Sequence, residues 1–155
     1  MEVVWRAGLD LNPIDVRDDR QVAWLEALVW PGEGQRLRLL RAAVEVARAD
    51  PPSLVCGDLR YDLPALARRA PPDATLVIFH SAVLAYIPDL ADRAAFANTV
   101  AGLNAVWVAN EGHGLVDGTD PPRPPWPTGD RFLLTRDRHP VAWTNGHGAS
   151  IQWIA

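Results

Sequence analysis

The chain has 155 residues, of which 48% are hydrophobic and 22% are charged, a composition typical of one globular domain with a sizeable core. Its formal net charge of -4 argues against a nucleic acid or an anionic membrane surface as its partner. No window approaches the roughly 18 apolar residues of a membrane span, and the first residues lack the pattern of a secretory signal. We therefore expect a soluble cytoplasmic protein with a single domain over residues 1–155.

A single cysteine, Cys56, excludes an intrachain disulfide and suits a reducing compartment. Because it ends a predicted strand, we expect its thiol to be buried and inert. The histidines His113, His139 and His147 are scattered along the chain and are not spaced as metal ligands usually are, so we expect no metal site.

The amino-terminal half alternates strands with helices. Apolar runs predict strands over residues 3–11 and 53–56, and the pair Asn12-Pro13 ends the first of them. Helical periodicity and capping residues predict helices from Asp18 or Asp19 to residue 29, over 36–49 and over 63–70.

The carboxyl-terminal half continues the alternation and then becomes β structure. We predict a strand over 74–80, a helix over 89–103, a strand over 105–109, a hairpin of 131–135 with 140–144, and a last strand over 150–154. The proline-rich segment 112–129 is long for a connection, so it is either a mobile loop or a binding element. Alternating strands and helices predict a mostly parallel sheet with right-handed crossovers, and the closing strands add an antiparallel hairpin.

Polar residues stand at the ends of four predicted strands. They are Asp10 with Asn12, Asp58, His80 with Ser81, and Asn110 with Glu111. The carboxyl ends of parallel strands meet at one edge of a sheet, where ligands of α/β proteins bind, so these residues predict a site. The alternative is that each aspartate or asparagine caps a helix or occupies a turn.

Each candidate has its own possible chemistry. Asp10 could accept hydrogen bonds from a ribose, and Asp58 from the amine of a base, although both could equally serve turns or caps. His80 could transfer a proton near neutral pH, or it could be a buried histidine bonded within the protein. Ser81 lacks the flanking glycines of a hydrolase nucleophile, which makes acyl hydrolysis a poor alternative.

The segments Gly8-Leu9-Asp10-Leu11-Asn12-Pro13, Val55-Cys56-Gly57-Asp58, Phe79 to Tyr86 and Asn110-Glu111-Gly112 resemble a bacterial family of uncharacterised function. Its longer members look like Rossmann-type methyltransferases that use S-adenosylmethionine. The resemblance implies a Rossmann-like three-layer sandwich in which Asp10 binds the ribose and Asp58 lies near the adenine amine. It also implies that Phe79, His80 and Ser81 lie beside the reacting methyl group, with His80 as the candidate catalytic residue.

The resemblance also implies a missing element, because no glycine-rich first strand precedes residue 3 of this chain. In the methyltransferase strand order 3-2-1-4-5-7-6, that strand lies between the second and the fourth. Its absence would leave strand edges open, and open edges invite pairing. We therefore expect a homodimer, a strand-pairing partner or a rearranged sheet.

Three functions follow as hypotheses. The first is a partial methyltransferase-like protein, truncated at its amino terminus, that binds S-adenosylmethionine or another small molecule weakly or without catalysis. The second is a non-catalytic binding or assembly module. The third, a serine hydrolase using Ser81 and a histidine, has the least support from the sequence.

Overall fold

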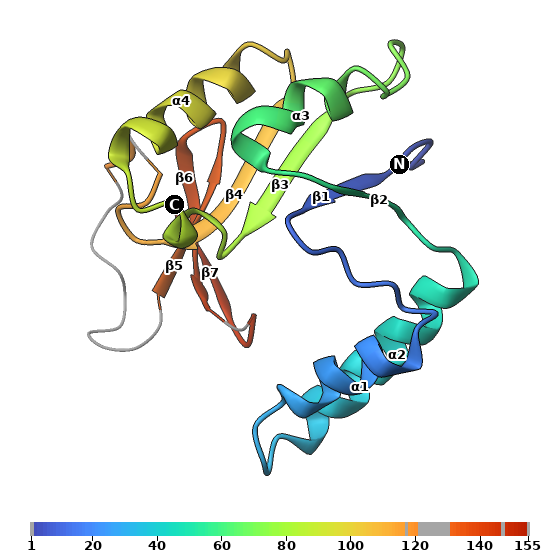
Figure 1. Cartoon of the computed structure of the whole chain (residues 1–155). Helices are drawn as coiled ribbons and strands as arrows, with labels where there is room; N and C mark the ends of the chain where they lie inside the picture. Colours follow the sequence, from blue (N-terminus) through green and yellow to red (C-terminus); the bar gives the residue numbers. More distant parts are fainter. Residues whose placement is uncertain (1, 117, 121–130, 147, 155) are drawn as a thin grey trace. The chain divides into compact units, whose positions relative to one another are not determined.

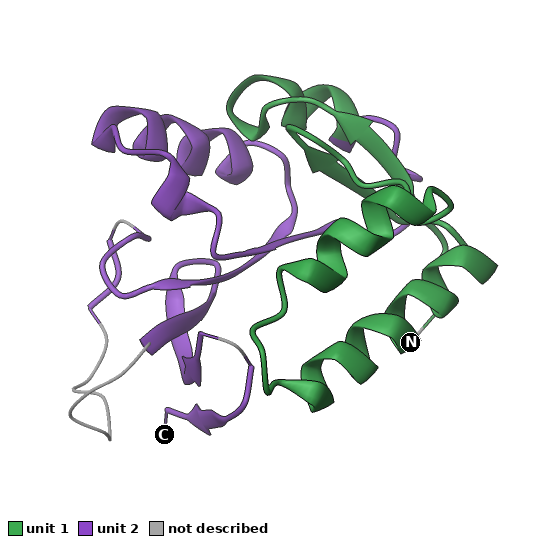
Figure 2. Cartoon of the chain, turned by 60° about the horizontal axis from the view of Figure 1, so that its bottom comes forward, with its two compact units in different colours: residues 1–66 green, residues 67–155 purple. Residues whose placement is uncertain are grey.

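The computed structural model describes residues 2–116, 118–120, 131–146 and 148–154. The chain is mixed α/β and divides into two compact units, residues 1–66 and 67–155 (Figure 2). It contains a two-stranded parallel sheet and a five-stranded mixed sheet. Each unit is described by itself below. Among the described residues, no helix combines the length and the apolar character needed to cross a membrane.

Unit 1 contains two strands and three helices. They are β1 (Ala7–Asp10), α1 (Asp19–Ala27), α2 (Gly34–Ala49), β2 (Ser53–Cys56) and α3 (Leu59–Ala67), which ends at the boundary with unit 2 (Figure 1). The strands β1 and β2 pair in parallel, from Ala7 opposite Ser53 to Asp10 opposite Cys56. Among the described residues of this unit, only Val44 and Leu66 are buried. The core of unit 1 is therefore small.

The strand β1 is shorter than the predicted strand over 3–11, because its partner β2 limits where the pairing can start. Pro51 and Pro52 directly precede β2, and proline has no N–H to donate to a ladder. The pairing therefore starts at Ser53, and Val3 and Val4 stay exposed and outside the sheet. Strand β2 matches its prediction, but Cys56 is exposed, so the expectation of a buried thiol is wrong.

The helix α3 begins four residues before the predicted start at residue 63. The side chain of Asp58 accepts a hydrogen bond from the backbone N–H of Arg60 at 2.9 Å and so caps the helix at Leu59. Pro64 then lies inside the helix and does not mark its beginning.

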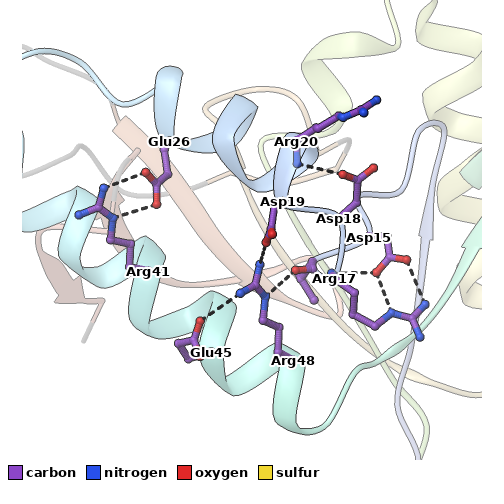
Figure 3. Close-up of polar contacts among 10 residues, drawn as sticks. Asp15, Arg17, Asp18, Asp19, Arg20, Glu26, Arg41, Glu45 and Arg48 are labelled. Atoms are coloured by element: carbon purple, nitrogen blue, oxygen red, sulfur yellow. Dashed lines mark hydrogen bonds and ion pairs between the residues drawn. The ribbon is translucent and has the colours of Figure 1, made fainter.

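The helices α1 and α2 form a hairpin fastened by ion pairs (Figure 3). The Arg41 guanidinium donates to both carboxylate oxygens of Glu26, at 2.8 Å each. Arg48 donates to Asp19 at 2.6 Å and to the carbonyl oxygen of Val16 at 2.7 Å. The hydrogen bonds from Arg41 lower the pKa of Glu26 below its ordinary value of 4.5. These contacts hold the two helices together, because the helices bury little apolar surface against each other.

Unit 2 is built around the five-stranded sheet. It contains β3 (Val77–Ser81), a 3-10 turn η1 (Leu84–Tyr86), α4 (Leu90–Ala101), β4 (Val106–Gly112), β5 (Arg131–Arg136), β6 (His139–Asn145) and β7 (Ile151–Trp153). The strands lie in the order β3-β4-β5-β6-β7. Only β3 and β4 are parallel, and each later strand is antiparallel to its predecessor.

The core of unit 2 lies between α4 and one face of the sheet. Phe96 and Val100 of α4 are buried, and the Phe96 ring meets Trp107 of β4 edge to face with centroids 6.0 Å apart. Strand β4 alternates half-buried with buried residues, so Trp107, Ala109 and Glu111 point to one face and Asn110 to the other. Figure 1 shows α4 running along the sheet.

The predicted Rossmann-like sandwich is not confirmed, although the α/β class is. The order 5-7-6 implied by the resemblance would place the second hairpin strand beside β4, whereas the structure places the first, β5, there. Pairing with β5 also extends β4 to Gly112, beyond the predicted end at 109. Asn110 and Glu111 consequently lie inside a strand. Residues 117 and 121–129 of the predicted loop lie outside the described residues.

We expect the α1–α2 hairpin to loosen in acid. The pKa of Glu26 is lowered in the folded chain, so its stabilising contribution is present above the unfolded pKa and is lost as the pH falls through the folded one. Hydrogen exchange of α1 and α2 amides between about pH 6 and pH 3 should show this loss, and Glu26→Gln should reduce it. The control Glu45→Gln, whose contact with Arg48 is 3.5 Å long, should leave the profile close to wild type. An unchanged profile in Glu26→Gln would contradict the assignment.

Candidate functional site

The strongest polar cluster of unit 2 surrounds His80 on β3. The Nδ1 atom of His80 lies 2.6 Å from Oε1 of Glu111, and the indole Nε1–H of Trp107 donates to Nε2 of His80 at 2.9 Å. The ring also meets Phe96 edge to face, with centroids 5.6 Å apart. The His80 side chain is 10% exposed. Both ring nitrogens therefore have partners inside the protein.

These contacts fix where the proton of His80 resides. An atom that accepts from the indole of Trp107 carries no proton, so the ring proton is on Nδ1 and is donated to Glu111. A neutral imidazole held in this way has no ring nitrogen left for a ligand. Proton transfer by His80 would first require release of one of its two partners.

Glu111 is fully buried and has two further donors. Its Oε1 accepts from the backbone N–H of Val83 at 3.0 Å, and its Oε2 accepts from that of Leu84 at 3.2 Å. These N–H groups belong to the turn after β3, which Ala82 enters in the left-handed region with φ of 56°. A buried carboxylate is stable only when such donors compensate its lost hydration, so Glu111 fixes the path of the chain after β3.

A second polar row lies on the opposite face of the sheet. The Nδ2 group of Asn110 donates to the Ser81 hydroxyl at 3.2 Å, and the Thr144 hydroxyl donates to Oδ1 of Asn110 at 2.7 Å. Thr144 thereby orients the amide, and the hydroxyl proton of Ser81 remains available for another acceptor. Ser81 and its neighbour Phe79 are exposed. This row is open to a ligand, whereas the cluster around His80 is closed.

The predicted site residues of unit 1 have local partners. Oδ1 of Asp10 accepts from the backbone N–H of Asn12 at 2.8 Å, which is the turn contact proposed as its alternative role. Asp58 caps α3 and pairs with the Arg60 guanidinium at 2.7 Å, and this hydrogen bond is the main reason for its lowered pKa. The Gly57 N–H donates to the carbonyl oxygen of Asp10 at 2.9 Å, so the ends of β1 and β2 adjoin.

The structure thus brings the strand-end residues together in two groups, one in each unit. Asp10 and Asp58 follow neighbouring strands of unit 1, while His80, Ser81, Asn110 and Glu111 come from neighbouring strands of unit 2. That all of them form one site stays a prediction. Sequence reasoning missed Trp107 and Thr144. Trp107 could have been found, because it is an even number of residues from Glu111 on one strand and so lies on the same face of the sheet. No local pattern indicates Thr144.

Two hollows in the described part of the chain lie away from the predicted site residues. One lies between α1 and α2, and the other is lined by residues 67, 70–76 and 103–106, at the amino ends of β3 and β4. Among the described residues, no three His, Cys, Asp or Glu side chains gather as metal ligands would. His147 lies outside the described residues.

One comparison with known proteins identifies a relationship. A family model described as "Uncharacterized protein conserved in bacteria (DUF2332)" matches residues 1–153. No curated protein and no solved structure matches the chain. The family description specifies no activity, ligand or partner.

Removing the Glu111 carboxylate should destabilise unit 2 strongly. Glu111→Ala leaves His80 Nδ1 and two backbone N–H groups buried without an acceptor, for which we expect a loss of about 3–5 kcal/mol in unfolding free energy. Glu111→Gln should lose less, since one oxygen remains. Urea unfolding followed by tryptophan fluorescence measures both. The control Glu33→Ala, exposed and without a side-chain cap bond, should change stability by less than about 0.5 kcal/mol. A similar loss in the control and in Glu111→Ala would contradict this role.

Proposed function

We propose that this chain, which belongs to the bacterial family matched over residues 1–153, is a non-catalytic ligand-binding module. Its architecture would be part of that of an S-adenosylmethionine-dependent methyltransferase. The observation that carries the proposal is the contrast between the two faces of β3 and β4. One face offers an oriented polar row that ends on the exposed Ser81, while the other encloses the residue expected to perform chemistry.

The polar row has the properties of a binding surface. Thr144, itself 7% exposed, donates to Asn110 and so directs the amide towards Ser81. The Ser81 hydroxyl is left as an exposed donor beside the Phe79 ring. A donor next to an exposed aromatic ring suits a small molecule with both an acceptor and a flat or apolar part. Adenosine derivatives have this combination.

The enclosed face argues against catalysis. A general acid or base must reach its substrate with a free nitrogen, and both nitrogens of His80 are engaged by Glu111 and Trp107. A proton-transfer role for His80 therefore has less support than binding alone. It would require that Trp107 moves away from Nε2 of His80. The hydrolase alternative has less support still, because Ser81 bonds to Asn110 and points to the face opposite His80.

S-adenosylmethionine fits the residues of unit 1 only in part. The cofactor would supply a sulfonium methyl group, with Asp10 at the ribose and Asp58 at the adenine amine. Oδ2 of Asp10 has no partner among the described residues, whereas both oxygens of Asp58 accept from Arg60. Of these two aspartates, Asp10 is therefore the better candidate for contact with a ligand.

An assembly module is the second candidate, favoured by the open edge of β3 treated below. A cytoplasmic location is part of both proposals. It suits a chain whose one cysteine, Cys56, has an exposed thiol that a reducing compartment would protect.

Calorimetric titration tests the ligand proposal. We expect S-adenosylmethionine and S-adenosylhomocysteine to bind the wild-type chain weakly, and Ser81→Ala to reduce affinity about fivefold, the effect of one hydrogen bond worth about 1 kcal/mol. The control is Ser150→Ala, an exposed serine just before β7, which should bind as wild type does. No heat at millimolar ligand with the wild-type chain would exclude the proposal and leave the assembly module.

A further inference from the structure

The strand β3 is an edge of the five-stranded sheet, and one side of its backbone is unpaired. The carbonyl oxygen of Leu76 accepts from Val106 N–H, and Ala82 N–H donates to Asn110, so the even-numbered residues direct their backbone groups to β4. Successive residues of a strand direct these groups to opposite sides. Val77, Phe79 and Ser81 therefore direct their backbone N–H and C=O groups away from β4. Among the described residues, none forms a backbone hydrogen bond with these groups.

The side chains at this edge are also uncovered. Val77 is 51% exposed and Phe79 is 80% exposed, and with Ser81 they lie on the face opposite His80. Residues 74–87 contain no charged residue and no proline. Natural proteins use charge and proline to prevent pairing at edge strands, and this edge uses neither. The opposite edge of the same sheet, β7, is only three residues long.

We propose that this edge is a homodimer interface in which β3 pairs antiparallel with β3 of a second copy, about a two-fold axis at Phe79. Phe79 then lies opposite Phe79 of the second copy, and Val77 opposite Ser81 in both directions. Each of these three outward-facing residues then forms a hydrogen-bonded pair with the residue opposite it, and the two residues of a pair exchange two N–H···O bonds. The two-fold axis therefore satisfies every open backbone group of β3.

A second copy is favoured over another partner because the edge is complementary to itself. The outward-facing residues are Val77, Phe79 and Ser81, and the largest apolar side chain, Phe79, is in the centre. Two-fold pairing therefore places the two Phe79 rings opposite each other. An uncharged strand selects no oppositely charged partner, and it allows two chains of net charge -4 to meet without local repulsion. A single strand buries little area, so we expect a weak dimer. This inference shares Phe79 and Ser81 with the ligand proposal, but it does not require that a ligand binds.

Cysteine cross-linking tests the register. In a chain with Cys56→Ser, Phe79→Cys should form a disulfide-linked dimer on mild oxidation, because opposed Cα atoms of such a pair are about 5.5 Å apart. Val77→Cys is the matched control, since two copies of position 77 would be separated by about 13 Å along the strands. Mixing Val77→Cys with Ser81→Cys should restore the cross-link. Equal cross-linking of Phe79→Cys and Val77→Cys alone would overturn the register.

Sedimentation tests the dimer itself. The wild-type chain, measured from roughly 10 µM to 1 mM, should pass from monomer to dimer, and Phe79→Lys should remain monomeric across that range. Ile151→Lys changes an apolar residue that is 50% exposed on β7, so it should dimerise like wild type. Circular dichroism confirms that each variant is folded. A wild-type monomer at every concentration, or dimerisation abolished by Ile151→Lys and unaffected by Phe79→Lys, would overturn the proposal.

Discussion

Unit 2 depends on the buried carboxylate of Glu111. A charge without hydration is tolerated only where donors replace the lost water, and here one ring nitrogen and two backbone N–H groups do so. The same contacts bind β4 to the turn after β3 and fix the tautomer of His80. His80 in turn accepts from Trp107, whose ring packs on α4 through Phe96. The polar network and the apolar core of this unit are consequently one connected structure, and neither can be altered alone.

This arrangement gives the two faces of β3 and β4 different properties, because one is enclosed and the other is exposed along β3. Strand alternation sends His80 and Glu111 inward, and sends Ser81 and Asn110 to the other face. A residue that stabilises the core with both of its polar atoms is poorly suited to exchange protons with a ligand. On the outward face of β3, Val77, Phe79 and Ser81 are exposed, so their side chains are accessible for recognition. This contrast is the basis of the proposal that the chain binds a ligand without catalysing a reaction.

Local signals in the sequence were sufficient for much of the fold, and long-range pairing explains the errors. Strand β2 and the cap Asp18, one of the two positions predicted for it, follow from short-range preferences and agree with the structure. The position of Glu111 inside a strand does not follow from local signals, because β4 reaches Glu111 and Gly112 by pairing with Leu133 and Phe132 of β5. Cys56 was misjudged because burial depends on what covers a strand, and its own neighbours do not reveal that. The turn contact of Asp10 was foreseeable, whereas the partners of His80 come from a distant strand.

The contrast between the two units bears on how such a chain functions. Parallel strands are normally covered on both faces, yet no residue of β1 or β2 is buried. With Val44 and Leu66 as its buried residues among those described, unit 1 relies on ion pairs such as that of Glu26 with Arg41, and solvent-exposed pairs each add little. A unit of this kind gains stability from any added strand or chain that covers its sheet. The open edge of β3 is the basis of the dimer proposal, because pairing there would supply hydrogen bonds that the described residues leave incomplete.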